Sequence, residues 1–245
     1  MRISRALAMA GVGSRRKCEV HVTNGAVRVN GEIVRDLGRQ VDIEQDEIVF
    51  RGKVLSFERF VYYVLNKPVG FTTTAEDPHA EKTVYQLLPR NLVRATVQAG
   101  PNRIRVFPVG RLDKDSMGLL LFTNDGDLAN RLTHPRYGVS KWYDVRLHRA
   151  FDPRDAKKLL AGIRLREGWA KAQTVQRLSQ RVVRLEIREG KKREIRRMFK
   201  SVGYQVNELC RIAFGPLRLE NLGPGQGRFL KTSEIAALTS SVSAD

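Results

Sequence analysis

The segment GRLDKDSMGLLLFTNDG, residues 110–126, carries the most information about the fold of this chain. Its four consecutive apolar residues, Leu119–Phe122, predict a buried strand, and Asn124-Asp125-Gly126 predicts a turn directly after it. Asp113 stands on the loop that enters this strand, where a rigid core element can hold a catalytic group in place. A second interpretation remains open, in which Asp113 is a turn residue paired with its neighbour Arg111.

A basic segment, EGKKREIRRMF at residues 189–199, is the second informative stretch. Residues 181–200 contain nine basic and three acidic side chains, a net charge of +6. Ile195, Met198 and Phe199 recur at helical spacing and predict a helix that docks by one face. Its arginines would then lie near the docked face, where a guanidinium needs a carboxylate or phosphate partner. The alternative is a basic helix that is simply solvated.

The third stretch, KWYDV at residues 141–145, reads as a strand with alternating polarity. Its tyrosine, Tyr143, suits stacking against a nucleic-acid base. Packing in the core explains Tyr143 equally well, so the residues alone do not choose between the two roles.

From Val61 onward, strand-like and helix-like segments follow one another in an irregular order. This order favours an α+β fold with a largely antiparallel sheet over a regular βαβ alternation. The predicted strands are Val61–Leu65, Arg103–Phe107, Leu119–Phe122, Trp142–Leu147, Lys171–Leu178 and Val182–Arg188. The predicted helices are Leu128–Thr133, Arg154–Ala161, Arg193–Val202 and Ser233–Leu238.

The first 59 residues form a separate predicted unit. A helix from Ile3 to Ala10 precedes a second helix that Ser14 can cap. The strand Ala26–Val29 then lies between two Asn-Gly pairs that favour tight turns. Residues 1–35 carry seven basic and two acidic side chains, whereas residues 36–60 carry four and six. The helical part is therefore expected to face a polyanion.

Overall charge points to the class of partner. The 245 residues include 44 Lys and Arg against 26 Asp and Glu, a net charge of +18. Such an excess favours a nucleic acid first and an anionic membrane surface second. No apolar run is long enough for a membrane span, and the N-terminus reads as that of a mature cytosolic protein. Neither cysteine nor histidine spacing predicts a metal site, and no phosphate-binding glycine loop is present.

Together these segments resemble the RsuA-type pseudouridine synthases, which act on bacterial ribosomal RNA. The resemblance is carried by GRLDKDSMGLLLFTNDG, KWYDV and EGKKREIRRMF, by NKPVGFTTT at residues 66–74, and by the closing segment at residues 211–238. Residues 4–31 resemble the S4-type RNA-binding domain that often precedes this catalytic domain. One position departs from the pattern, because Met117 stands where relatives commonly have glutamate.

The resemblance implies an S4-like domain at residues 1–59 and a catalytic domain at residues 60–245, built on a mixed, largely antiparallel sheet. It implies conversion of a uridine to pseudouridine with no cofactor and no metal. Asp113 would be the catalytic carboxylate, Arg196 its basic partner, and Tyr143 the residue that stacks on the uracil.

The resemblance and the charge pattern also suggest which residues contact RNA. The expected RNA-binding residues are Arg5, Arg15, Arg16, Lys17, Arg111, Lys141, Lys192, Arg193 and Arg197. The expected partner is ribosomal RNA, from the large subunit in preference to the small, or a ribosome-assembly particle. A cytoplasmic monomer with no membrane contact is expected. The competing function is a non-catalytic RNA-binding or ribosome-assembly protein in which Asp113 and Arg196 form only an ion pair.

Overall fold

A computed structural model describes residues 1–57, 59–74, 82–94 and 104–242 of the chain. These residues divide into two compact units. The first gathers residues 1–61, 88–107 and 123–125, and the second gathers residues 62–87, 108–122 and 126–245. Each unit has its own core, and the predicted functional segments of residues 110–199 all lie mainly in the second.

The first unit contains two short helices and a small antiparallel sheet. Its helices are α1 (Ile3–Met9) and α2 (Arg15–Thr23), and its sheet has the order β2 (Glu32–Val34), β1 (Val27–Val29), β3 (Ile48–Phe50), β4 (Lys53–Val54). Ser14 caps α2 as expected, because its hydroxyl accepts a hydrogen bond from the Lys17 amide at 3.3 Å. Asn30 and Gly31 both have positive φ, so they form the predicted tight turn between β1 and β2.

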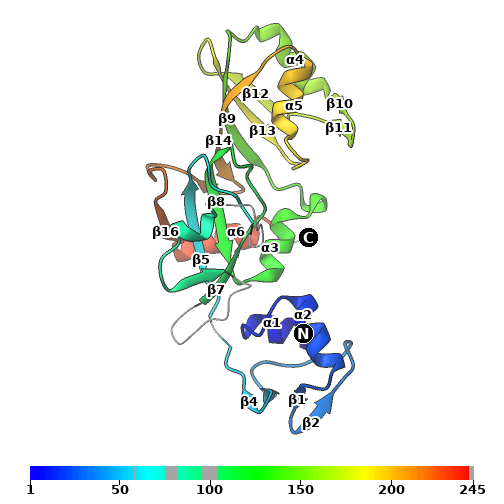
Figure 1. Cartoon of the computed structure of the whole chain (residues 1–245). Helices are drawn as coiled ribbons and strands as arrows, with labels where there is room; N and C mark the ends of the chain where they lie inside the picture. The colour runs from blue at the N-terminus through cyan, green and yellow to red at the C-terminus, as the bar shows by residue number, and fades with distance from the viewer. Residues whose placement is uncertain (58, 75–81, 95–103, 243–245) are drawn as a thin grey trace. The chain divides into compact units, whose positions relative to one another are not determined.

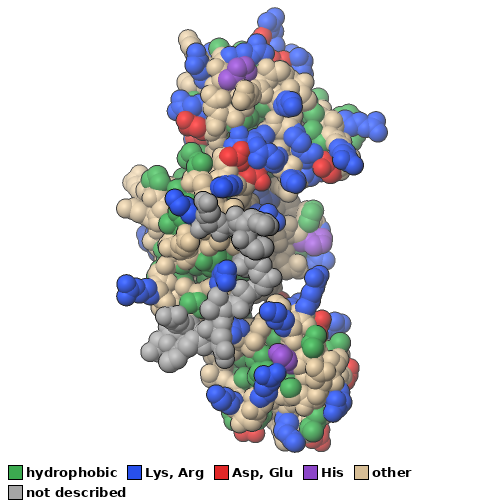
Figure 2. Space-filling model, viewed as in Figure 1, with side chains coloured by type: hydrophobic (Ala, Val, Ile, Leu, Met, Phe, Trp, Pro, Cys, Tyr) green, Lys and Arg blue, Asp and Glu red, His purple; other side chains and the backbone are tan. Residues whose placement is uncertain are grey.

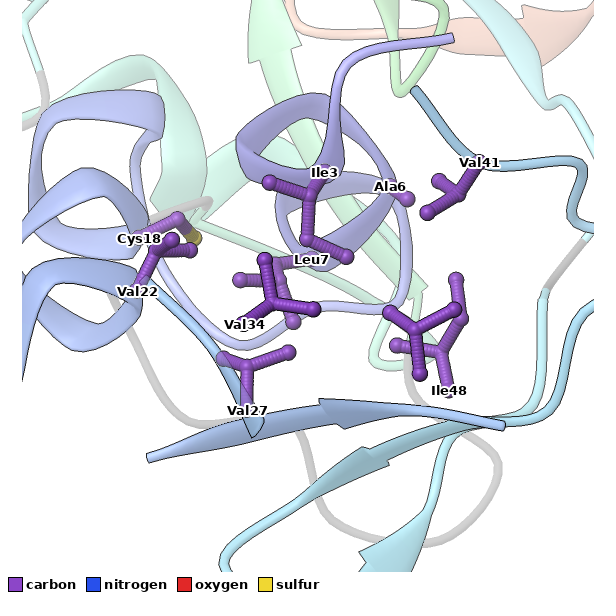
Figure 3. Close-up of a cluster of buried hydrophobic side chains, with 10 residues drawn as sticks. Ile3, Ala6, Leu7, Cys18, Val22, Val27, Val34, Val41 and Ile48 are labelled. Atoms are coloured by element: carbon purple, nitrogen blue, oxygen red, sulfur yellow. The ribbon is translucent and has the colours of Figure 1, made fainter. Parts of the chain in front are cut away.

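The core of the first unit lies between these helices and strands. Figure 3 shows side chains from α1, α2 and the strands pointing toward one another. Its fully buried members include Ile3 and Leu7 of α1 and Val22 of α2. The spacing of Ile3 and Leu7 places both on one face of α1, which is why this short helix docks. The unit also includes β6 (Leu92–Arg94), which pairs in parallel with β7 (Ile104–Pro108).

The second unit is built on a mixed sheet, so the expected α+β class is confirmed. The strand order along the sheet is β12 (Thr174–Arg177), β13 (Val182–Ile187), β9 (Lys141–Leu147), β14 (Val206–Phe214), β8 (Met117–Thr123), β5 (Tyr62–Lys67), β16 (Gly227–Phe229). Strands β12, β13, β9 and β14 pair antiparallel in succession, and β16 pairs antiparallel with β5. Strand β14 pairs with β8 in parallel.

The parallel contact between β8 and β14 depends on one glycine. Gly118 adopts φ +107°, and a Cβ placed on it would lie 2.3 Å from the carbonyl oxygen of Arg211. Only a residue without a side chain permits so close an approach of the two backbones. The glycine of the signature segment therefore joins the two halves of the sheet beside the loop that carries Asp113.

Helices and short turns connect the strands of the second unit. They are η1 (Val84–Leu87), α3 (Gly126–Thr133), η2 (Pro135–Tyr137), η3 (Pro153–Asp155), α4 (Ala156–Ala161), α5 (Glu194–Ser201) and α6 (Thr232–Ser240). A two-stranded hairpin pairs β10 (Ile163–Leu165) with β11 (Gly168–Ala170), and β15 (Leu217–Arg218) pairs with β14. Helix α4 contacts β12, and α5 contacts β14 and the β10 strand of the hairpin (Figure 1).

The predicted stripe on α5 is the face that docks. Ile195, Met198 and Phe199 are all buried, and their spacing turns the basic side chains of the helix toward its other faces. Within the described residues, each strand and helix predicted from residue 61 onward lies within three residues of its predicted bounds. Arg103, which was included in one predicted strand, lies outside the described residues. No helix of the described residues is long and apolar enough to cross a membrane.

Candidate active site

Asp113 and Tyr143 line one pocket of about 400 Å³ in the second unit. The pocket wall also includes the segment Gly190–Ile195 before and at the start of α5, and Leu209 from β14. Three stretches that are distant in the sequence, GRLD, KWYDV and EGKKREIRRMF, therefore meet at one cavity. This meeting is the geometric basis for treating the pocket as the candidate active site.

A buried lysine holds the loop that carries Asp113. Lys67 ends β5 and is 0% exposed. Its ammonium group donates hydrogen bonds to the carbonyl oxygens of Asp113 at 3.0 Å and Ser116 at 2.6 Å. A third bond, at 3.1 Å, goes to the carbonyl of Pro68. Burial lowers the pKa of Lys67 to about 8, although the nearby carboxylates of Asp115 and Asp113 act in the opposite direction.

Two further contacts join the NKPVGFTTT segment to the same loop. The amide of Gly70 donates to the carbonyl of Lys114 at 2.8 Å, and the hydroxyl of Thr73 donates to the carbonyl of Leu112 at 2.9 Å. The loop is thus bound on both sides of Asp113 by backbone and side-chain hydrogen bonds. Such anchoring keeps a loop carboxylate in a defined position.

Tyr143 lies on β9, an interior strand of the sheet between β13 and β14. It is 7% exposed and stands opposite Leu185 on β13 and Arg211 on β14. Directly opposed residues of antiparallel strands project from the same face, so Tyr143 and Arg211 share a face. Tyr143 is therefore buried and also lines the pocket. An aromatic ring needs both properties if it is to pack within the protein and stack on a bound base.

The carboxylate that pairs with Arg196 is Asp115, not Asp113 as expected. Arg196 Nε lies 3.2 Å from an Asp115 carboxylate oxygen, and Arg196 Nη2 donates to the Asp115 carbonyl at 2.8 Å. A third bond, from Nη1 to the carbonyl of Val206 at 2.8 Å, fixes the guanidinium in this place. These backbone hydrogen bonds from residue 115 and from β14 position the Arg196 guanidinium beside Asp115, the second aspartate of the loop.

Asp115 also binds Arg193 through both carboxylate oxygens, at 3.1 and 2.8 Å. Burial alone would raise the pKa of Asp115, but the hydrogen bond from Arg193 and the charge of Arg196 outweigh it and lower the pKa. Among the described residues, no basic group lies within ion-pair distance of the Asp113 carboxylate. The ion pair with Arg111 that the second interpretation required is therefore absent as well.

The start of α5 is shaped by an internal carboxylate. Glu194 is 4% exposed, and its side chain accepts a hydrogen bond from the Lys191 amide at 3.0 Å. Burial raises the pKa of Glu194. Arg193 adopts φ 50°, a left-handed conformation that the tight turn before the helix imposes. This turn brings the backbone of residues 190–193 to the pocket.

The expected RNA-binding residues of the second unit fall into two groups. Arg111 and Lys192 are exposed at the pocket, and no carboxylate among the described residues pairs with either. Arg193 and Arg197 already hold carboxylates, those of Asp115 and Glu167. A second cavity of about 1020 Å³ lies beside them, and Arg196, Arg197 and Lys200 contribute to its lining. Lys141 lies at a third cavity, described below.

In the first unit, the expected residues gather at one helix end. Arg15, Arg16 and Lys17 are exposed in the first turn of α2, whereas Arg5 on α1 is half-buried. A helix N-terminus with three cations is well suited to an anion. Figure 2 shows Lys and Arg side chains distributed over the visible surface of each unit.

Three residues near the site were not anticipated from the sequence: Lys67, Asp115 and Arg211. Lys67 follows an apolar segment at the end of a strand, and a lysine in such a position is normally expected to be exposed to solvent. Asp115 differs from Asp113 only in its position on the loop, so the sequence offers no signal for its two arginine partners. Arg211 lies on a strand that the sequence did not predict.

Comparisons with known proteins assign both parts of the chain. The RNA pseudouridylate synthase family matches residues 61–201, and the S4 domain family matches residues 1–48. Within these ranges lie Asp113, Tyr143 and Arg196, and the helix end at Arg15–Lys17.

Relatives cover nearly the whole chain. An RNA pseudouridine synthase of Aquifex aeolicus is 40% identical, over 99% of this chain and 95% of its own length. The ribosomal large subunit pseudouridine synthase B of Bacillus subtilis is 37% identical, over 97% of this chain and 95% of its own length. A solved pseudouridylate synthase structure is 31% identical, with a TM-score of 0.67, and covers 97% of this chain and 99% of that one. The chain is therefore a member of the RNA pseudouridylate synthase family with an N-terminal S4 domain.

Proposed function

We propose that this pseudouridine synthase isomerises a specific uridine in ribosomal RNA, with Asp113 as the reacting carboxylate. The observation that supports the proposal is the pocket that Asp113 and Tyr143 both line, because it offers a carboxylate and an aromatic ring to one bound nucleotide. Stacking on an aromatic ring can hold the uracil in place once it is detached, and a carboxylate can act on the ribose to break the glycosidic bond.

The reaction breaks the bond between C1′ and N1, turns the uracil, and joins C5 to C1′. The proton leaves C5 and a proton returns to N1, so no atoms or electrons are exchanged with a cofactor. Asp113 performs the first step either as a nucleophile at C1′ or as a base toward the 2′ proton. Both routes use the ionised carboxylate, and the open side of Asp113 toward the pocket serves either.

Tyr143 stacks on the uracil and holds it while it turns. In the last step its hydroxyl is the candidate acceptor of the C5 proton. Arg196 acts through Asp115, whose carboxylate and carbonyl it binds, and so fixes the loop that carries Asp113. Its place in the mechanism is positioning, in contrast to the direct ion pair expected from the sequence.

RNA reaches the pocket by contacts with its phosphates. Arg111 and Lys192 stand exposed at the pocket with no carboxylate partner among the described residues. Removing the target base from its stack costs a few kcal/mol in general, about as much as a few such contacts return. The basic turn of α2 in the S4 domain supplies a second contact that raises the effective concentration of RNA at the pocket.

The large-subunit RNA is the proposed substrate, either free or in an assembling particle. Support comes from the Bacillus subtilis relative, whose name states that activity. We infer that the enzyme works as a monomer in the cytoplasm, because one chain supplies each named group and because ribosomal RNA is modified there. The predicted boundary between the domains, at residues 59 and 60, belongs to this proposal too.

Release of tritium from C5-labelled uridine in protein-free ribosomal RNA tests the proposal. Wild type and Asp113→Asn are compared, because the amide keeps the shape of the side chain and removes its ionisable group. Release by wild type that disappears in the variant supports the assignment. Equal release by both refutes the role of Asp113. Release by neither, from naked RNA and from ribosomal particles, favours the non-catalytic RNA-binding function.

A further inference from the structure

A third cavity, of about 460 Å³, lies beside the candidate active site. It shares Arg111, Tyr143, Gly190 and Lys191 with the catalytic pocket, so the two cavities adjoin and Tyr143 lines both. The remaining wall includes Arg211, Lys141 and Phe214. The roles proposed above for Asp113 and Tyr143 leave this cavity unexplained.

Arg211 brings a buried guanidinium with spare donors to this cavity. The residue is 2% exposed, and its Nε donates to the carbonyl of Leu119 on β8 at 2.8 Å. Its buried Nη2 has no hydrogen-bond partner among the described residues. A buried donor without a partner costs about 1–3 kcal/mol, and more when it is charged. Such a group indicates a missing ligand.

Lys141 brings a second cation to the same wall. Its Nζ lies 3.2 to 3.5 Å from three carbonyl oxygens, those of Val139, Arg188 and Glu189. Both cations approach the Phe214 ring, with its centroid 5.8 Å from Lys141 Nζ and 5.2 Å from Arg211 Cζ. Burial and the charge of Arg211 lower the pKa of Lys141 to about 8, although Glu194 opposes this. The two cations thus approach the same aromatic ring and line the same cavity, where like charges repel each other.

No carboxylate of the described residues lies within 4 Å of either Lys141 or Arg211. Glu189 lines the same cavity but is paired with Lys191. A buried and a half-buried cation with no carboxylate in direct contact are costly unless an anion joins them. A neutral base could accept hydrogen bonds from them but could not balance their charge. The anion that RNA supplies within reach of a uracil on Tyr143 is a backbone phosphate.

We propose that Arg211 and Lys141 form a phosphate subsite next to the catalytic pocket, which binds a backbone phosphate of the substrate RNA adjacent to the target uridine. The inference rests on the proposed RNA substrate but not on the identity of the catalytic residue. Nη2 of Arg211 donates to a phosphate oxygen, and the Lys141 ammonium, held by its three carbonyl acceptors, adds its positive charge to the same cavity. The bound phosphate anchors the target nucleotide on the far side of Tyr143 from Asp113.

The salt dependence of RNA binding tests this subsite. The full chain is titrated with a ribosomal large-subunit RNA transcript, and Lys141→Gln and Arg211→Gln are each compared with wild type. Loss of one phosphate contact lowers the slope of log Kd against log salt by about 0.7 to 0.9. The ratio of variant Kd to wild-type Kd should thus fall about three-fold between about 50 mM and about 200 mM salt.

Lys157→Gln is the matched control. Lys157 is an exposed lysine of α4 outside the three cavities described here, so its loss removes the same charge without the subsite. It should leave the slope unchanged. Arg211→Gln alters a buried side chain, so circular dichroism and thermal unfolding accompany it. Lys141 is only half-buried, and its variant keeps the test decisive if the Arg211 variant does not fold.

Two results would overturn the subsite. A slope unchanged by Lys141→Gln shows that no phosphate contact was lost. An equal fall of the slope in Lys157→Gln shows that net charge, and not a phosphate held by the subsite, sets the salt dependence. Because binding is measured without catalysis, the subsite can stand even if tritium release fails, and can fail even if tritium release succeeds.

Discussion

Lys67 and Ser116 are joined by a 2.6 Å hydrogen bond from the lysine ammonium to the serine carbonyl, wholly inside the second unit. The same ammonium holds the carbonyl of Asp113. One buried charge therefore fixes both ends of the turn that carries the candidate catalytic carboxylate. It also explains why the NKP and GRLD segments occur together in one domain although some forty residues separate them.

Replacing this lysine should loosen the loop. Lys67→Met keeps the length and apolar stem of the side chain and removes three hydrogen bonds from a charged donor. We expect a loss of stability of about 2 kcal/mol and a fall in kcat with little change in RNA affinity. Urea unfolding and tritium release measure the two effects. Wild-type kcat in a folded Lys67→Met protein would show that the loop keeps its shape without the lysine.

The lowered pKa of Lys67 also predicts how stability depends on pH. The folded value is about 8 and the ordinary value is 10.5, so between them the unfolded chain binds more protons than the folded one. Stability from this group therefore rises with pH through that window, by up to about 1.4 kcal/mol per pH unit. Wild type should gain stability relative to Lys67→Met between about pH 7.5 and pH 9. A constant difference would mean that Lys67 titrates normally.

Asp115 offers a test of positioning apart from catalysis. Its carboxylate binds Arg193 and Arg196, so Asp115→Ala releases Arg193 and leaves Arg196 held by backbone carbonyls alone, which should lower kcat by about 10- to 100-fold. Asp115→Asn keeps one oxygen acceptor and should recover part of that loss. RNA should bind both variants at least as tightly as wild type, because one negative charge is lost and Arg193 becomes available to a phosphate. Weaker binding by both variants would point to a general loss of structure.

Much of the fold could be predicted from the sequence, and the reasons are local. Leu119–Phe122 could only be a buried strand, and Ser14 caps α2 through a hydrogen bond three residues away. Strand β14 was not predicted, because Asn207, Glu208 and Arg211 interrupt its apolar pattern. The strand lies between β9 and β8 in the sheet, and these long-range neighbours are not contained in any local window of sequence.

The candidate site divides in the same way. Asp113 and Tyr143 follow from residue type and family resemblance, and they share a pocket. The partner of Arg196 could not be predicted, because Asp113 and Asp115 are alike in sequence and differ only in where Val206 and the loop backbone hold the guanidinium. Arg211 was missed with its strand. Contacts between distant segments are what the sequence leaves undetermined.

Gly118 tests the junction of β8 and β14. An alanine there would place its Cβ 2.3 Å from the Arg211 carbonyl oxygen and would keep a positive φ. We expect Gly118→Ala to destabilise the second unit by about 3 kcal/mol or more. The Cβ would clash with a backbone oxygen that the sheet holds in place, and alanine disfavours the positive φ. Gly126→Ala is the matched control, since nothing lies within 4 Å of its Cβ position at the start of α3. Equal unfolding midpoints for the two variants in urea would contradict the proposed junction.

The last prediction concerns the S4 domain. Arg15, Arg16 and Lys17 are exposed in the first turn of α2, where the helix dipole adds to their charge. Replacing all three with glutamine should raise KM for ribosomal RNA and reduce the salt slope of binding by about two units, because up to three phosphate contacts are lost. The kcat value should stay within about two-fold, because none of the three belongs to the catalytic pocket.

Arg51, Lys53 and Arg59 form the control set. They are exposed basic residues in the more acidic part of the same unit, and replacing them with glutamine removes an equal charge. If both triple variants raise KM equally, net charge and not the α2 turn determines RNA affinity, and the proposed second contact is wrong.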